Sequence, residues 1–148
     1  MDDKAKNVLN RLEALCSRRE YCSSEIMAKA LKALDSDAEA ASELVSALVK
    51  DGFVSDLRYA TAFARDKSSL TGWGPIKIRY ALSAKKIDRE TIDAALSDTD
   101  SEKAQEKLEK LILAKKKTLE GDPQARLKLI KFALSRGYEY DQVRKLVG

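Results

Sequence analysis

The sequence predicts an all-α protein in which three tandem three-helix repeats stack in a curved array. Only six Gly and two Pro interrupt the 148 residues, and apolar residues recur at spacings of three and four along nearly the whole chain. The middle and last thirds also superimpose with a constant shift of 51 positions. A three-helix unit of this size buries its apolar stripe only partly when alone, which favours stacking. An irregular single helical bundle is the alternative.

The repeat is visible in chemically matched positions. Each third has the order helix, turn, helix, basic turn and short helix, although the first third fits this order loosely. The matched pairs are Ile78 with Leu129, Lys85 with Arg136, Ile87 with Tyr138, Ile92 with Val143, and Leu96 with Val147. We therefore expect three units with boundaries at residues 1–54, 55–99 and 100–148.

Three helices are expected in the first third. Apolar residues at helical spacing across residues 8–15 predict the first helix. Two serines open the second, over residues 23–34, and Asp37 opens the third, which extends to a glycine cap at Gly52. These start and stop signals define the first unit.

The middle third repeats this order. Ser55 or Asp56 caps a helix that continues through Arg65, and a Gly-rich turn at 71–75 places its proline at the first position of the next helix. An aspartate at position 88 starts the unit's third helix.

The last third begins with a long, charged helix that follows the polar stretch at 97–101 and reaches about Thr118. A Gly-Asp-Pro break at 121–123 separates it from a helix through residues 127–132, which a cap at Gly137 ends. A short helix from Asp141 completes the chain. The three lysines at the end of the long helix offset its macrodipole, which explains them as structural residues.

Composition excludes several classes of function. Histidine is absent, which removes His-dependent catalytic triads and His-containing zinc sites. Cys16 and Cys22 are interpreted as reduced cytosolic thiols that pack as small apolar side chains, and helix capping explains Asp35 and Asp37. No apolar run approaches the length of a membrane span, and no Gly-rich phosphate loop or nucleophile motif is present. We expect a cytoplasmic protein without enzymatic activity, metal or cofactor.

Positive charge is concentrated toward the C-terminal side. The net charge is −3 over residues 1–56, +2 over 57–100 and +5 over 101–148. It is densest within 58–87, where seven cations are opposed only by Asp66. The seven are Arg58, Arg65, Lys67, Lys77, Arg79, Lys85 and Lys86. Such a patch attracts an anionic polymer or an acidic protein face, although single exposed cations on solvated helices are ordinary.

Aromatic residues lie among these cations. Trp73 and Tyr80 are interleaved with basic side chains, an arrangement that can stack on unpaired bases. Trp73 either caps the core at a repeat junction or stands exposed as an anchor for a partner. Tyr59 and Phe63 are four residues apart and are predicted to face the core.

Four ordered stretches give the chain a resemblance to a known family. They are ALCSRREY at 14–21 followed by SEI at 24–26; residues 48–60 with GFVSD at 52–56 and RYA at 58–60; GPIKI at 74–78 through Leu82 to KKI at 85–87; and SRGYEYD at 135–141. Together they resemble the RecX regulators of the bacterial RecA recombinase. The chain departs from the family where Lys86 replaces a common glycine, which suggests a different helix end, and where Ala133 replaces a large aliphatic residue.

The resemblance implies an elongated, curved molecule of three three-helix repeats that lodges in the groove of a RecA filament on single-stranded DNA. It implies a protein that acts by occupancy and hinders filament extension, ATP hydrolysis, strand exchange and the repressor cleavage of the SOS response. We expect the seven cations above to face the groove or its DNA, with Trp73 and Tyr80 as apolar anchors. Asp56 and Tyr59 are assigned to the helix start and to packing. A monomer is expected.

Two other interpretations remain open. The first is a nucleic-acid-binding helical module that affects recombination by covering DNA, against which the small net charge and the acidic first third argue. The second is a general protein scaffold, because helical repeats present concave surfaces to many partners.

Overall fold

The computed structural model describes residues 1–148 as nine α-helices without a β-strand, which confirms the all-helical prediction. The helices are α1 (Asp3–Cys16), α2 (Ser23–Ala33), α3 (Ala38–Lys50), α4 (Asp56–Ser69), α5 (Pro75–Ala84), α6 (Arg89–Ser97), α7 (Ser101–Thr118), α8 (Ala125–Ser135) and α9 (Tyr140–Val147). None of them combines the length and the apolar character needed to cross a membrane.

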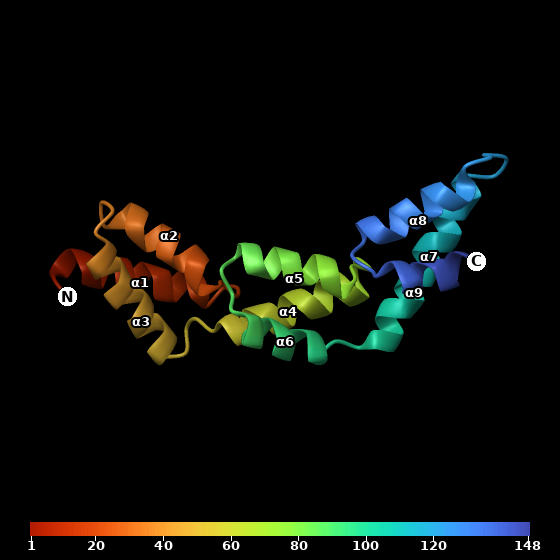
Figure 1. Cartoon of the computed structure of the whole chain (residues 1–148). Coiled ribbons are helices and arrows are strands. Elements are labelled where there is room, and N and C mark those ends of the chain that lie inside the picture. The colour runs from red at the N-terminus through yellow and green to blue at the C-terminus, as the bar shows by residue number, and fades with distance from the viewer.

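The nine helices form three consecutive three-helix units in an elongated, curved molecule, as the repeat predicted (Figure 1). The two chain ends lie at opposite ends of the array. The second helix of each unit, α2, α5 and α8, follows the upper edge in this view. The alternative of one irregular bundle is therefore wrong, because the buried residues separate into three clusters instead of one.

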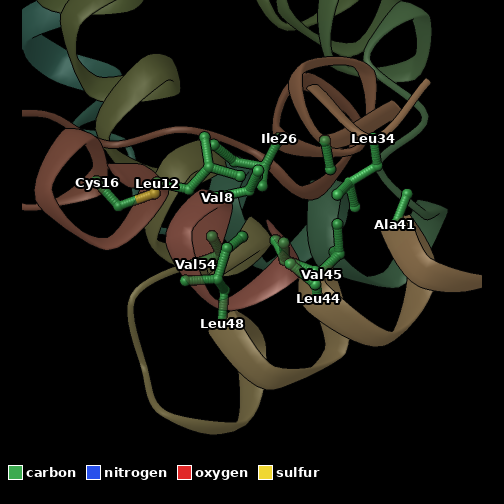
Figure 2. Packing of buried hydrophobic residues seen from close by; sticks show 12 residues of the cluster. Val8, Leu12, Cys16, Ile26, Leu34, Ala41, Leu44, Val45, Leu48 and Val54 are labelled. Carbon is green, nitrogen blue, oxygen red and sulfur yellow. The ribbon is translucent and has the colours of Figure 1, made fainter. Parts of the chain in front are cut away.

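The first cluster lies between α1, α2 and α3 (Figure 2). Ile26, Leu44 and Leu48 are fully buried there. They lie on the apolar stripes that the helical period predicted, and full burial of such a side chain contributes about 1.5–3 kcal/mol. Cys16 ends α1 inside this cluster as a free, buried thiol.

The second and third clusters occupy the equivalent place in the following units. Ile78, Leu82 and Ile92 are central to the second cluster, and Leu108 and Val143 are fully buried in the third. The second cluster also contains a residue from the first unit. Cys22, which immediately precedes α2, is fully buried among the residues of α4, α5 and α6.

Local capping explains where most helices begin. The side chains of Asp37 and Ser55 accept hydrogen bonds from the third residue beyond them, at 3.1 and 3.2 Å, and Pro75 is the first residue of α5. Asp35 differs from the capping prediction. Its backbone is left-handed, with φ 54°, and its carboxylate binds Lys4 at 2.5 Å, because α2 has already ended and the chain must reverse before α3.

Asp56 joins the first unit to the second. Its carboxylate accepts two hydrogen bonds from Ser23, one from the backbone N–H and one from the hydroxyl, each at 2.7 Å. The neighbouring Ser24 hydroxyl donates to the carbonyl oxygen of Lys85 at 2.5 Å. The start of α2 is therefore held between the start of α4 and the end of α5.

Backbone hydrogen bonds, together with the packing of α4 on α7, join the second unit to the third. The N–H of Gly74 donates to the carbonyl oxygen of Arg136 at 2.6 Å, and the N–H of Ile76 donates to that of Gly137 at 3.0 Å. A side chain at Gly74 is excluded, because its Cβ would lie 2.6 Å from the Gly137 carbonyl carbon. The two junctions are equivalent, since Lys85 and Arg136 are 51 positions apart.

Lys86 adopts the conformation of the glycine that it replaces. Its φ is 61°, and the residue 51 positions later, Gly137, has φ 95°. The expectation that α5 ends differently is therefore wrong. The Lys86 N–H donates to the carbonyl of Ser83, as Gly137 donates to Leu134, and the junction imposes this turn on a residue that carries a Cβ.

Candidate functional site

The nine predicted contact residues all lie in the second unit but do not form one cluster. The structure places them on two helices and in the turns that follow them: Arg58, Arg65 and Lys67 on α4; Trp73 between α4 and α5; Lys77, Arg79 and Tyr80 on α5; and Lys85 and Lys86 after α5. Two of these residues, Lys67 and Lys77, come together around the ring of a third, Trp73. The others are divided between the first junction, the side of α6 and the exposed surface of α5.

Trp73 is the centre of the group that comes together. Its ring packs edge-on against Phe63, with the centroids 6.1 Å apart and the planes at 72°. The ammonium nitrogens of Lys67 and Lys77 lie 4.7 and 4.4 Å from the indole centroid, within the range of cation–π attraction. Trp73 is half-buried against the second core. It therefore packs against the core beside the junction, as one interpretation predicted, and two lysines lie over its ring.

Tyr59 and Phe63 form the layer below Trp73. Their rings stack with centroids 6.1 Å apart, and both pack against the second core, which confirms the predicted core-facing positions. Burial raises the pKa of the Tyr59 hydroxyl. The stacked rings of Tyr59 and Phe63 therefore support the Trp73 indole and fix its orientation against the second core.

Carboxylates from outside residues 58–87 neutralise four of the seven cations. The pairs are Arg58 with Glu20, Arg65 with Asp98 at 2.7 Å, Arg79 with Asp93 at 2.5 Å, and Lys85 with Glu25 at 3.2 Å. A count of charges along residues 58–87 missed these pairs, because Asp66 is the only acidic residue in that range. Folding brings the other carboxylates from the loop before α2, from α2, from α6 and from the residue after α6. The patch is less positive than its sequence indicates.

Arg58 and Lys85 have structural partners at the first junction. Arg58 also donates to the carbonyl oxygen of Gly52 at 3.1 Å, and its pairing with Glu20 raises the pKa of the guanidinium. The hydrogen bond to Glu25 raises the pKa of Lys85. Both cations therefore connect the first two units, and a change at either position perturbs the fold as well as the surface.

Three cations have no carboxylate partner within 4 Å. Lys67 and Lys77 lie against Trp73, and Lys86 stands exposed in the left-handed turn after α5. Among the large apolar and aromatic residues, Tyr80 is the most exposed, with 79% of its surface accessible. These residues are the part of the predicted site that is free to meet a partner.

The sequence reasoning missed further exposed apolar residues on α5 and α8. Ile76 lies one helical turn from Tyr80 on α5, and Leu127 and Leu134 are exposed on α8. Their signal was available, because Ile76 and Leu127 are 51 positions apart and neither α5 nor α8 contains an acidic residue. Histidine, cysteine and carboxylate side chains form no cluster suited to a metal ion.

Comparison with known proteins identifies the family. The family model described as "RecX, second three-helix domain" matches residues 55–96. The chain is 35% identical over 131 residues to the "Regulatory protein RecX" of Chromohalobacter salexigens, and the match covers 88% of this chain and 84% of that protein. It is 37% identical over 117 residues to the protein of the same name from Clostridium botulinum strain Alaska E43, which covers 75% of this chain but only 53% of the longer relative.

A solved structure agrees with the fold. The crystal structure of RecX from Lactobacillus salivarius superimposes with a TM-score of 0.86 over 99% of this chain and 96% of that chain, at 23% sequence identity. This likeness shows the three-unit architecture, while the sequence identity to the relative from Chromohalobacter salexigens, over most of both chains, shows the descent. The chain therefore belongs to the RecX family of regulatory proteins.

Proposed function

We propose that this protein is a non-enzymatic regulator that lodges in the helical groove of a RecA filament assembled on single-stranded DNA. Membership of the RecX family carries the proposal. The elongated array supports it, because a curved row of units suits contact with successive subunits of a polymer. One copy acts, and its units, bounded at residues 1–54, 55–99 and 100–148, contact neighbouring protomers.

Regulation follows from occupancy of the groove. A protein that bridges adjacent protomers hinders filament extension and the conformational changes that accompany ATP hydrolysis. The same occupancy blocks the entry of a second DNA strand and of the repressor whose cleavage triggers the SOS response. The protein needs no cofactor for this action and works in the cytoplasm, where the filament forms.

The proposed contact surface contains the nine residues of the second unit. Lys67, Lys77 and Lys86 support this assignment most directly, because they have no carboxylate partner and offer positive charge to an acidic face or to DNA. Tyr80 adds an exposed aromatic anchor. Arg65 and Arg79 contribute if the partner competes for them with Asp98 and Asp93.

A direct nucleic-acid-binding module is the second candidate. The cations around Trp73 favour it, because an indole among ammonium groups can stack on an unpaired base. The same contacts also weaken it, since Lys67 and Lys77 already lie against the ring and Phe63 packs on its edge. Such a protein would inhibit recombination by coating DNA.

ATP hydrolysis by preformed RecA filaments, titrated with this protein, distinguishes the two candidates. Fluorescence anisotropy of the same labelled DNA without recombinase is measured in parallel. Inhibition at concentrations well below those that bind bare DNA supports the groove mechanism, and inhibition that appears only when bare DNA is coated supports the second candidate. Absence of inhibition and of filament binding contradicts both.

Charge reversal tests the contact surface. The variant Lys77→Glu with Arg79→Glu is expected to weaken inhibition by at least about tenfold, since it replaces two cations of the proposed surface, both partly exposed, by carboxylates that an acidic partner repels. The matched control is Lys103→Glu with Lys110→Glu, which makes the same change in net charge at exposed positions on α7. Equal inhibition by the surface variant and the wild type would show that the surface is wrongly assigned.

A further inference from the structure

The second helices of the three units form one continuous row. The start of α2 is bonded to the turn after α5 through Ser24 and Lys85, and the start of α5 is bonded to the turn after α8 through Gly74 and Arg136. Figure 1 shows the three helices following one another along the same long edge. Positions 51 residues apart in α5 and α8 are equivalent within their units.

This row is almost free of acidic residues. Neither α5 nor α8 contains Asp or Glu, and the one carboxylate of α2, Glu25, is bound to Lys85. Asp93 pairs with Arg79 and Asp122 pairs with Lys128 from outside the row. The row carries seven cations: Lys29, Lys32, Lys77, Arg79, Arg126, Lys128 and Lys131. Two of the third helices differ, because α3 and α6 each carry two acidic residues and one basic residue, while α9 carries one acidic and two basic residues.

Large apolar side chains are exposed along the same row. On α5, Ile76 and Tyr80 are 50% and 79% exposed, and on α8, Leu127 and Leu134 are 49% and 38% exposed. Ile76 and Leu127 occupy equivalent positions, so the array presents one apolar group on each of two adjacent units. Solvent exposure of four such side chains among cations is typical of a binding surface.

We call this row the middle-helix ridge and define it as the seven cations together with Ile76, Tyr80, Leu127 and Leu134. We infer that the ridge docks onto an acidic protein surface that has apolar hollows. The inference rests on the proposed function in taking the RecA filament as the partner, and it extends the contact from the second unit to α2 and α8.

The apolar groups favour a protein partner over nucleic acid. Phosphates would satisfy the seven cations, but the edge of a DNA backbone offers no pocket for Ile76, Leu127 or Leu134. Burial of these aliphatic side chains in protein pockets removes apolar surface from water, while the surrounding cations select acidic partners. Equivalent apolar groups on adjacent units suit a partner whose surface repeats, such as a polymer of identical subunits.

The test compares pairs of substitutions on different units. Ile76→Ser with Tyr80→Ser removes the apolar group of α5, and Leu127→Ser with Leu134→Ser removes that of α8. The matched control is Val49→Ser with Leu113→Ser, two exposed apolar residues on α3 and α7 outside the ridge. Melting followed by circular dichroism verifies that each variant remains folded, as expected from the exposure of the replaced side chains.

Binding to RecA filaments on labelled single-stranded DNA is measured beside binding to the same DNA alone. Each ridge pair is expected to weaken filament binding by about tenfold or more, while the control pair changes it by less than about twofold. Binding to bare DNA is expected to remain unchanged, because no cation has been removed.

The failures can be told apart. Wild-type protein that binds filaments, with ridge variants of the same affinity, overturns the ridge and leaves the proposed function standing. Loss of affinity in the α5 pair alone overturns the extension to the third unit. An equal loss on bare DNA identifies a nucleic-acid surface and also overturns the inference. Wild-type protein that does not bind filaments overturns the proposed function and the ridge with it.

Discussion

The Tyr138 hydroxyl donates a hydrogen bond to the carbonyl oxygen of Gly72 at 3.0 Å and so connects the third unit to the second. Tyr138 is almost fully buried, and this burial raises the pKa of its hydroxyl, which keeps it protonated as a donor. No other side-chain donor reaches this carbonyl oxygen. The bond therefore connects the turn before α5 with the turn after α8.

Tyr138→Phe is expected to lower the free energy of unfolding by about 1 kcal/mol, because it leaves the Gly72 carbonyl without its partner in a buried place. Urea unfolding followed by circular dichroism measures the change. Tyr140→Phe is the control, since the Tyr140 side chain is half exposed. Equal midpoints for wild type and Tyr138→Phe would show that the bond contributes nothing to stability.

Gly137→Ala is expected to destabilise the protein by at least about 2 kcal/mol. The residue has φ 95°, and a Cβ there would lie 2.5 Å from the backbone nitrogen of Lys77. Gly121→Ala is a close control, because Gly121 also has a positive φ, 80°, but has open space around it. That control is expected to lose only about 1 kcal/mol, from the left-handed backbone alone. Similar losses in both variants would contradict the close approach of α5 to the third unit.

Lys86→Gly is expected to stabilise the protein by about 0.5–1 kcal/mol, because Lys86 has φ 61° and glycine adopts this conformation without a Cβ penalty. The measurement is again the urea midpoint. Lys86→Ala separates backbone from charge, since it removes the cation but retains the Cβ, and it is not expected to raise the midpoint. A stabilising Lys86→Ala would assign the effect to the charge.

Glu25→Gln is expected to destabilise the protein by about 1 kcal/mol at neutral pH. Burial acts to raise the pKa of Glu25, but hydrogen bonds from the Cys22 N–H and from Lys85 outweigh it and lower the pKa below its usual range. A lowered pKa stabilises the folded state above the unfolded-state pKa, and this contribution is lost as the pH falls through the folded-state pKa.

The difference between wild type and Glu25→Gln is therefore expected to be constant near neutrality and to shrink in acid. Unfolding midpoints across a pH series measure it. Glu39→Gln, at an exposed position on α3, serves as the control. A difference that persists unchanged in strong acid would mean that the charge of Glu25 is not the cause.

The helices could be predicted because their signals are local. Asp37, Ser55 and Pro75 mark helix starts within one turn of the residues that they affect, and the apolar period identifies each buried stripe. The repeat of 51 positions then predicted the units, since equivalent apolar residues line equivalent cores. Asp56 was assigned only to a helix start, because its bond to Ser23 spans 33 residues and leaves no local trace.

The site was harder to predict for the same reason. The charge of residues 58–87 was counted along the sequence, whereas Asp98 and Glu20 reach Arg65 and Arg58 through the fold. The residues of the ridge stand out only when segments 51 residues apart are compared, because the absence of acidic residues is a property that α5 and α8 share. Composition along one stretch does not describe a surface that several units share.

Cys22 belongs to the first unit by sequence and to the second by packing. If α2 unfolds, the second core loses a fully buried side chain, and if α4 unfolds, Ser23 loses both bonds to Asp56. The stability of the first two units is therefore coupled through these two contacts. The third unit is joined to the second by the packing of α4 on α7, by the backbone bonds of Gly74 and Ile76 and by the Tyr138 hydroxyl, and its buried cluster contains only its own residues. Unfolding of α2 therefore affects the next unit directly, because it opens the second cluster at the place that Cys22 fills, whereas the third cluster keeps all of its residues.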